Sequence, residues 1–124
     1  MPHPLEHSPA GRPLDAAEAI EIAEGMRAFG AESRVRILFA LYDEKQTVEQ
    51  LAAATDSEAN AVSQQLRVLR QLRYVAAKRE GRHVRYRLYD HHVHELLAAI
   101  RHHHEHARNL WSSPIPDSEV VEDG

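Results

Sequence analysis

The spacing of hydrophobic residues changes along this chain from the period of a helix to that of a strand, and then changes back. Between residues 14 and 72, apolar side chains recur every three or four positions, which is typical of amphipathic helices. Between residues 75 and 88, apolar and polar side chains alternate, which is typical of strands. From His91 the helical spacing returns. The sequence therefore predicts a mainly α-helical fold with one small β-hairpin near its end.

Several expected elements have a boundary signal in the sequence. Asp15 is a candidate helix cap, and Thr47 followed three residues later by Gln50 is the pattern of a capping box. Gly81 marks a turn between two strands. The helices are expected at 14–29, 33–42, 48–54, 59–72 and 91–111. The strands are expected at 75–79 and 83–88.

The prolines of this 124-residue chain lie only near its two ends, at positions 2, 4, 9, 13, 114 and 116. Because proline interrupts regular structure, we expect one domain at 14–111 between flexible tails at 1–13 and 112–124. The sequence has neither an apolar run long enough to span a membrane nor a signal-peptide pattern, which favours a cytoplasmic protein with no membrane partner. The absence of cysteine excludes disulfides and thiolate metal sites.

Basic side chains are concentrated in one block of an acidic chain. Residues 61–90 carry eight basic and two acidic side chains, although the net charge of the whole chain is −4. The expected elements around this block are a short helix, a tight turn, a second helix and a basic hairpin. That is the order of a winged helix-turn-helix, which places its second helix in the major groove of DNA. We therefore predict that double-stranded DNA is a partner.

The candidates for DNA contacts form two groups. Polar side chains on the second helix can reach base edges, and these are Asn60, Ser63, Gln64 and Arg67. Cations on the hairpin can neutralise phosphates, and these are Lys78, Arg79, Arg82 and Arg85. The alternative is an α+β domain whose strands merely carry solvated basic side chains. The combination of helix-turn-helix, hairpin and local charge favours DNA binding.

Three segments of the expected domain form a pattern of their own: SRVRIL at 33–38, SQQLRVLR at 63–70 and GRHVRYRL at 81–88. They resemble the ArsR/SmtB family of metal-responsive repressors over about residues 14–111, with a departure at Gln65, where that family often has histidine. The resemblance implies a homodimer formed by the first and last helices and an inverted-repeat operator that is released when metal binds. It implies a transcriptional repressor, not an enzyme, with no small-molecule substrate.

Seven of the ten histidines lie between residues 91 and 106. At about 100° per residue, His92, His103 and His106 share one helix face, and Asp90 directly precedes the helix. His92 and His103 are about 16 Å apart along the axis, which is too far for one ion with bonds of about 2 Å. A complete site therefore needs a second, antiparallel helix, so that Asp90 and His92 of one subunit join His103 and His106 of the other.

One carboxylate and three imidazoles suit zinc, cobalt or nickel better than calcium or magnesium. The spacing of Asp90, His92, His103 and His106 is also similar to the last-helix metal site of the ArsR/SmtB family. Nickel prefers additional ligands, and His3 is a candidate because the start of the chain resembles the nickel/cobalt sensors of that family. We expect nickel or cobalt, with zinc as the alternative.

The remaining histidines of the last helix do not fit this set. His91, His94 and His102 fall on the opposite side, where a solvated position is expected, and His104 falls in the apolar stripe, where packing is expected. Two other functions stay open, a winged-helix regulator that responds to a non-metal signal and a histidine-rich nickel store. The basic block argues against the store, which has no need of DNA.

Overall fold

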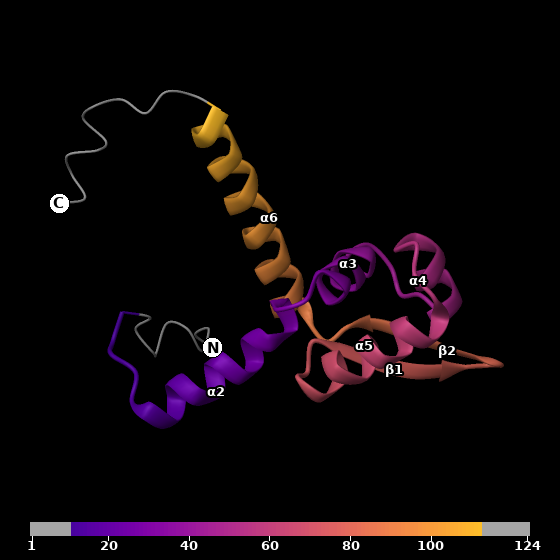
Figure 1. Ribbon diagram of the computed structural model, residues 1–124. Helices are drawn as coiled ribbons and strands as arrows, with labels where there is room; N and C mark the ends of the chain where they lie inside the picture. Colours follow the sequence, from indigo (N-terminus) through magenta and orange to yellow (C-terminus); the bar gives the residue numbers. More distant parts are fainter. Residues whose placement is uncertain (1–10, 113–124) are drawn as a thin grey trace.

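The computed structural model describes residues 11–112 and shows helices around a two-stranded sheet (Figure 1). In chain order the elements are α2 (Ala16–Met26), the 3-10 helix η1 (Arg27–Phe29), α3 (Glu32–Ala40), α4 (Val48–Ala54), α5 (Ala59–Gln71), β1 (Val75–Glu80), β2 (His83–Leu88) and α6 (His91–Ser112). The prediction of a mainly helical fold with one hairpin is confirmed. Helices α4 and α5 form the helix-turn-helix, and β1 and β2 form the wing.

Two helices begin with capping boxes, one at Thr47 that the sequence predicted and one at Asp15, where the sequence predicted only a cap. The Asp15 carboxylate accepts a hydrogen bond from the amide of Glu18 at 2.8 Å. The Thr47 hydroxyl accepts one from the amide of Gln50 at 3.1 Å, and the Gln50 side chain accepts one from the amide of Thr47 at 2.9 Å. Each cap satisfies amide groups that the helix itself leaves unpaired, which is worth about 1 kcal/mol.

The prediction of one helix at 14–29 is wrong in its last turn. Helix α2 ends at Met26, and the chain tightens into η1, closed by a 3.0 Å hydrogen bond from the amide of Gly30 to the carbonyl of Arg27. The tighter turn buries Ala28 in the core and sets the ring of Phe29 edge-on to Tyr74, with 5.4 Å between ring centroids. Packing therefore decides where this helix ends.

The second helix also ends earlier than the expected residue 42. Helix α3 stops at Ala40 because the amides of Leu41 and Tyr42 bond to carbonyls three residues back, those of Leu38 and Phe39. Such bonds are typical of a final turn that tightens into 3-10 geometry. The other expected boundaries agree with the structure to within two residues.

The hydrophobic core lies between α3, α4, α5 and the base of the wing. Its fully buried large side chains are Ile37, Leu38, Leu41, Leu51, Val62, Leu66, Leu69, Val75 and Leu97. Helix α6 reaches this core only with its first turns, through Val93 and Leu97. The core therefore fixes the DNA-binding unit and the root of α6.

The wing is an antiparallel pair in which Val75 lies opposite Leu88 and Glu80 lies opposite His83. Gly81 turns the chain at φ +64°, a left-handed conformation that glycine adopts without strain. At the base of the wing, Gln46 exchanges two backbone hydrogen bonds with Tyr86, at 2.9 and 2.7 Å. This bridge joins the wing to the segment that enters α4.

Helices α2 and α6 extend away from the body in different directions (Figure 1). No side chain of α2 is buried, and Ile20 is 70% exposed. Helix α6 also leaves Leu96 and Leu110 exposed. Within residues 11–112, no helix is both long enough and apolar enough to cross a membrane. The two projecting helices thus carry apolar surface that this chain alone does not cover.

Candidate nucleic-acid interface and metal centre

Helix α5 has one buried face and one polar face. Val62, Leu66 and Leu69 fill the core. The predicted base-contacting residues all lie on the exposed side, and these are Asn60, Ser63, Gln64 and Arg67. Side chains of this kind on an exposed helix can reach the donors and acceptors on base edges in a major groove.

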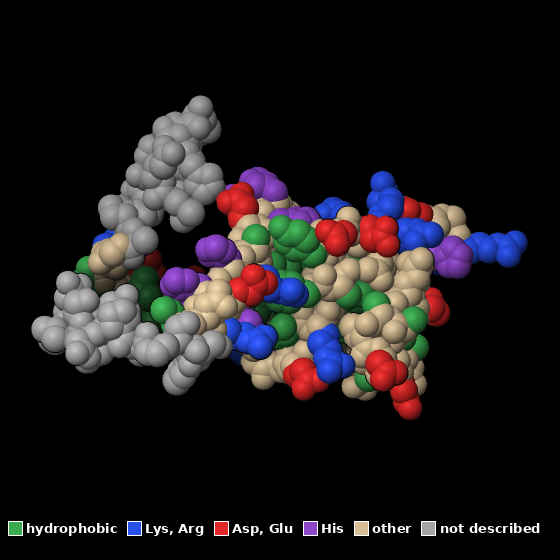
Figure 2. Space-filling model, turned by 90° about the horizontal axis from the view of Figure 1, so that it is seen from above, with side chains coloured by type: hydrophobic (Ala, Val, Ile, Leu, Met, Phe, Trp, Pro, Cys, Tyr) green, Lys and Arg blue, Asp and Glu red, His purple; other side chains and the backbone are tan. Residues whose placement is uncertain are grey.

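The wing carries cations beyond the body of the domain. Figure 2 shows Lys and Arg side chains projecting at the wing tip. Lys78, Arg79 and Arg82 are exposed, as an interaction with phosphates requires. Tyr86 and Leu88 pack inward from β2, whereas Val84 near the tip is exposed.

Arg85 differs from the other three wing cations because it also contacts the protein. Its Nε lies 3.4 Å from Glu80 Oε1, and its Nη1 donates to the side-chain oxygen of Gln50 on α4 at 3.4 Å. Glu80 also pairs with Lys45, with 2.7 Å between Nζ and Oε2. The hydrogen bond from Lys45 is the main cause that lowers the pKa of Glu80, and the charges of Arg85 and Lys78 add to it. Arg85 therefore ties the wing to α4 as well as facing solvent.

Arg34 was not among the predicted site residues, yet it joins three elements. Its Nε and Nη2 donate to the carbonyl of Arg27 at 3.1 and 2.7 Å, and its Nη1 donates to the side-chain oxygen of Gln65 at 3.0 Å. The guanidinium thus links η1 and α3 to the recognition helix α5. Gln65 is turned toward Arg34 and is half-buried, unlike its neighbour Gln64. Sequence spacing could not reveal a contact between positions 31 residues apart.

Asp90 and His92 form the first part of the predicted metal site, at the start of α6. Asp90 Oδ1 accepts a hydrogen bond from the amide of Val93 at 3.2 Å, and Oδ2 lies 3.5 Å from His92 Nδ1. Desolvation acts to raise the pKa of Asp90, but the Val93 amide and His92 outweigh it and lower the pKa. Both side chains remain about half exposed. The carboxylate is therefore charged and accessible at neutral pH.

His103 and His106 form the second part, one helical turn apart and exposed on the projecting half of α6. Most histidine side chains lie on the other side of the molecule from the wing tip (Figure 2). Within residues 11–112, no three potential ligands of a single chain converge on one point. The site expected between two subunits stays a prediction. The remaining candidate, His3, lies outside the described residues.

The expectation that His94 is simply solvated is wrong. Its Nε2 lies 3.0 Å from the carbonyl oxygen of Tyr42, and the two rings meet edge-on with centroids 5.2 Å apart. His91 faces outward and lies 3.7 Å from Glu95. His102 and His104 are exposed in this chain.

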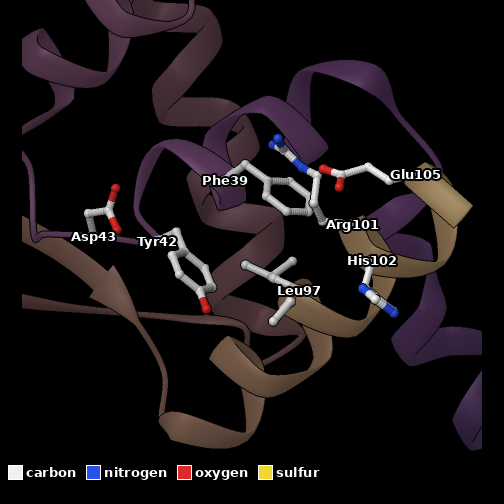
Figure 3. Close-up of a pocket in the computed structure, with 8 residues that line it drawn as sticks. Phe39, Tyr42, Asp43, Leu97, Arg101, His102 and Glu105 are labelled. Carbon is white, nitrogen blue, oxygen red and sulfur yellow. The ribbon is translucent and has the colours of Figure 1, made fainter.

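A cavity of about 440 Å³ lies between the end of α3 and α6 (Figure 3). It is lined by Phe39, Tyr42, Asp43, Leu97, Ala98, Arg101, His102 and Glu105. The Arg101 guanidinium lies over the Phe39 ring, 4.9 Å from its centroid. This cavity is on the side of α6 away from His92 and His103, because Arg101 is about 160–180° from them around the helix axis.

The fold and the exposed polar helix with its basic wing define a winged helix-turn-helix regulator. Residues 31–77 match the bacterial regulatory protein, arsR family. The HTH-type transcriptional regulator NmtR of Mycobacterium tuberculosis is 44% identical over 94 residues, which cover 76% of this chain and 78% of that protein. The transcriptional repressor SmtB homolog of Synechocystis is 41% identical over 90 residues, which cover 73% of this chain and 67% of that protein. This chain belongs to the ArsR family.

Solved structures agree with this assignment. Rv0081 of M. tuberculosis has a TM-score of 0.73 and 28% identity, covering 81% of this chain and 100% of that chain. The antimony-specific transcriptional repressor AntR has a TM-score of 0.69 and 32% identity, covering 87% of this chain and 99% of that chain. The homodimeric winged helix-turn-helix domain of Mb0332 from Mycobacterium bovis has a TM-score of 0.69 and 29% identity, covering 77% of this chain and 90% of that chain. The relatives are regulators, in agreement with the prediction that this protein is not an enzyme.

Proposed function

We propose that this protein is a metal-responsive transcriptional repressor. In this proposal a homodimer binds operator DNA without metal, and releases it when nickel or cobalt is held between the two α6 helices. The observation that carries the proposal is the arrangement of one charged carboxylate and three imidazoles along α6. Asp90 and His92 lie at the root of the helix, and His103 and His106 lie at its projecting half, all exposed.

The apolar surface of the projecting helices supports a dimer. Ile20, Ile22 and Met26 of α2, and Leu96 and Leu110 of α6, are exposed in the single chain. Removing apolar surface from water contributes roughly 25 cal/mol per Å², so a second copy that covers these helices stabilises both. The neighbour Mb0332 is described as homodimeric. A two-fold axis also presents two α5 helices to successive major grooves, which explains an inverted-repeat operator.

The carboxylate and imidazole ligands of the proposed site favour a transition metal of intermediate hardness. Neutral imidazole and carboxylate suit nickel, cobalt and zinc, and a bound ion would supply a cross-link between the two α6 helices. Asp90 and His92 of one subunit would hold it together with His103 and His106 of the other. Drawing these residues together changes the angle between the subunits and thus the spacing of the two α5 helices. Nickel or cobalt is favoured over zinc if His3 adds a ligand.

A cobalt(II) titration of the metal-free protein, followed by visible absorption, tests the site. We expect saturation at one ion per chain, with weak bands if five or six ligands bind and intense bands if the site is tetrahedral. Intense bands would favour zinc as the natural metal. His103→Ala should abolish saturation, whereas the adjacent His102→Ala should retain it. Loose uptake of many ions, or no saturable uptake, would contradict the proposed metal site.

DNA release is tested separately with fluorescently labelled duplex, selected by the metal-free protein from a random-sequence library. Nickel(II) or cobalt(II) should weaken binding of this duplex by the wild-type protein and leave binding by His103→Ala unchanged. Typical coupling between two sites is about 5–150-fold. A duplex that binds equally well with and without metal would instead favour a regulator of a non-metal signal.

A further inference from the structure

Helix α6 rests on the end of α3 through a row of three contacts. His94 meets Tyr42 edge-on, and Arg101 lies over Phe39 one turn earlier on α3. Between them, Leu97 is fully buried. Figure 3 shows Phe39, Tyr42, Leu97 and Arg101 together where the two elements meet. Through these contacts, α6 packs directly against the end of α3 and the turn that follows it.

The contact of His94 is also a directional hydrogen bond. A carbonyl oxygen can only accept, so the proton in the 3.0 Å contact between His94 Nε2 and Tyr42 O belongs to His94. The Tyr42 carbonyl lies in the turn that follows α3, outside the helix, and His94 supplies it with a hydrogen-bond donor. A histidine whose Nε2 carries this proton cannot bind a metal through that atom. His94 is thus held to the body of the domain.

The position of His94 places it between the proposed metal site and the DNA-binding unit. It is two residues from His92 but about 200° away around the helix axis. A tilt or rotation of α6 within its own subunit that moves His92 toward a partner would therefore change the contact of His94 with Tyr42. Tyr42 opens the short segment that leads to Gln46, which pairs with the wing, and to Thr47, which caps α4.

We infer that His94 is a positioning residue that couples the metal site on α6 to the DNA-binding unit through its hydrogen bond to the Tyr42 carbonyl. This role rests on the proposed function. It is separate from metal binding, because His94 is not among the ligands. It is also separate from DNA contact, because the Tyr42 carbonyl lies between α3 and α6 and away from the exposed face of α5.

The test compares His94→Ala and His94→Gln with the wild-type protein and with His102→Ala as a matched control. For each protein, the dissociation constant of the selected duplex is measured without metal and with saturating nickel(II), and nickel affinity is measured without DNA. In His94→Ala the ratio of the duplex dissociation constant with nickel(II) to that without metal should fall at least about fivefold. Its metal-free duplex affinity and its nickel affinity should stay within about twofold of wild type.

Glutamine can donate from its Nε2 to the same carbonyl, so His94→Gln should retain most of the wild-type ratio. His102→Ala, which changes another histidine of α6 on the cavity between α3 and α6, should retain all of it. Should His94→Ala lose thermal stability, His94→Leu fills the space without a donor and repeats the measurement.

The role of His94 is overturned if His94→Ala, or His94→Leu, keeps the wild-type ratio of duplex dissociation constants with and without nickel(II). It is also overturned if His94→Gln does not keep that ratio, or if His102→Ala lowers it as much as His94→Ala does. A wild-type protein that shows no response to nickel, cobalt or zinc contradicts the proposed function itself and removes this role with it. If nickel(II) weakens duplex binding equally in the wild-type protein and in His94→Ala, only the role of His94 is overturned.

Discussion

Arg34 shows how one side chain can determine the placement of the recognition helix. Its guanidinium makes three hydrogen bonds, two to the Arg27 carbonyl and one to Gln65 on α5. The planar fork of arginine reaches both partners with donors on three separate nitrogens, whereas lysine donates from a single nitrogen. The start of η1 and the inner side of α5 are therefore held in a fixed relation. Gln64, one residue away, is left facing outward.

Replacing Arg34 should weaken the fold as well as DNA binding. Arg34→Ala leaves the partly buried Gln65 amide and the Arg27 carbonyl without this partner, which we expect to lower the free energy of unfolding by about 1–3 kcal/mol. Arg34→Lys should recover only part of the loss. Urea denaturation measures the effect, with the exposed Arg79→Ala as a control expected within about 0.5 kcal/mol of wild type. Equal stabilities of the Arg34 and Arg79 alanine variants would contradict this role.

At the scale of elements, the wing is held to the body by Glu80 between Lys45 and Arg85. Because the hydrogen bond from Lys45 lowers the pKa of Glu80, the folded protein favours the charged carboxylate more than the unfolded chain does. The stabilisation is therefore complete above the ordinary glutamate pKa of about 4.3 and is lost as the pH falls through the lower folded value.

Glu80→Gln should consequently lower the urea midpoint at pH 7 and have a smaller effect near pH 3, because the stabilisation by the charge declines below the ordinary glutamate pKa of about 4.3. The measurement is the difference in urea midpoint between the two proteins at each pH. Glu21→Gln, on the exposed polar side of α2, serves as the control and should show no such pH-dependent difference. If the effect of Glu80→Gln were the same at both pH values, Glu80 would not stabilise the wing through its charge.

The elements differ in how far their sequences determine them. The capping boxes at Asp15 and Thr47 are local, because all their hydrogen-bonding groups lie within three residues, and the sequence predicted the cap at Asp15 and the box at Thr47. The period of two in the wing likewise needs no distant partner. The end of α2 depends on Phe29 packing against Tyr74, and the orientation of His94 depends on Tyr42, 52 residues away. Contacts at such separations are not visible in a hydrophobic period, so the sequence missed them.

The same difference between local patterns and contacts of distant residues applies to the candidate metal site. Helical geometry places His92, His103 and His106 on one face of α6, because that geometry is a property of any helix. It also predicts that a single chain cannot close the site. The sequence does not show that Asp90 is at once a helix cap and a neighbour of His92. That double role aims the carboxylate before any metal arrives.

At the scale of the whole molecule, the proposed DNA binding and metal binding both depend on the same pairing of subunits. One chain presents one α5 helix, and one α6 helix carries the two halves of the proposed metal site at opposite ends. A single exposed residue on α2, Ile20, therefore offers a way to test both activities together. It is 70% exposed in the single chain and distant in sequence from every proposed DNA or metal contact.

Ile20→Asp should disrupt the dimer, because a charge in an apolar interface loses its hydration without gaining a partner. Sedimentation velocity should show a monomer at concentrations where wild type is a dimer. Affinity for the selected duplex should fall by on the order of 100-fold, since the second half-site no longer binds as part of the same particle. Saturable cobalt binding should disappear, although Asp90, His92, His103 and His106 are all unchanged. Glu21→Ala, on the polar side of α2, should leave all three properties intact. A monomeric Ile20→Asp protein that still bound one cobalt ion per chain would show that the site closes within one subunit, which contradicts the intersubunit arrangement.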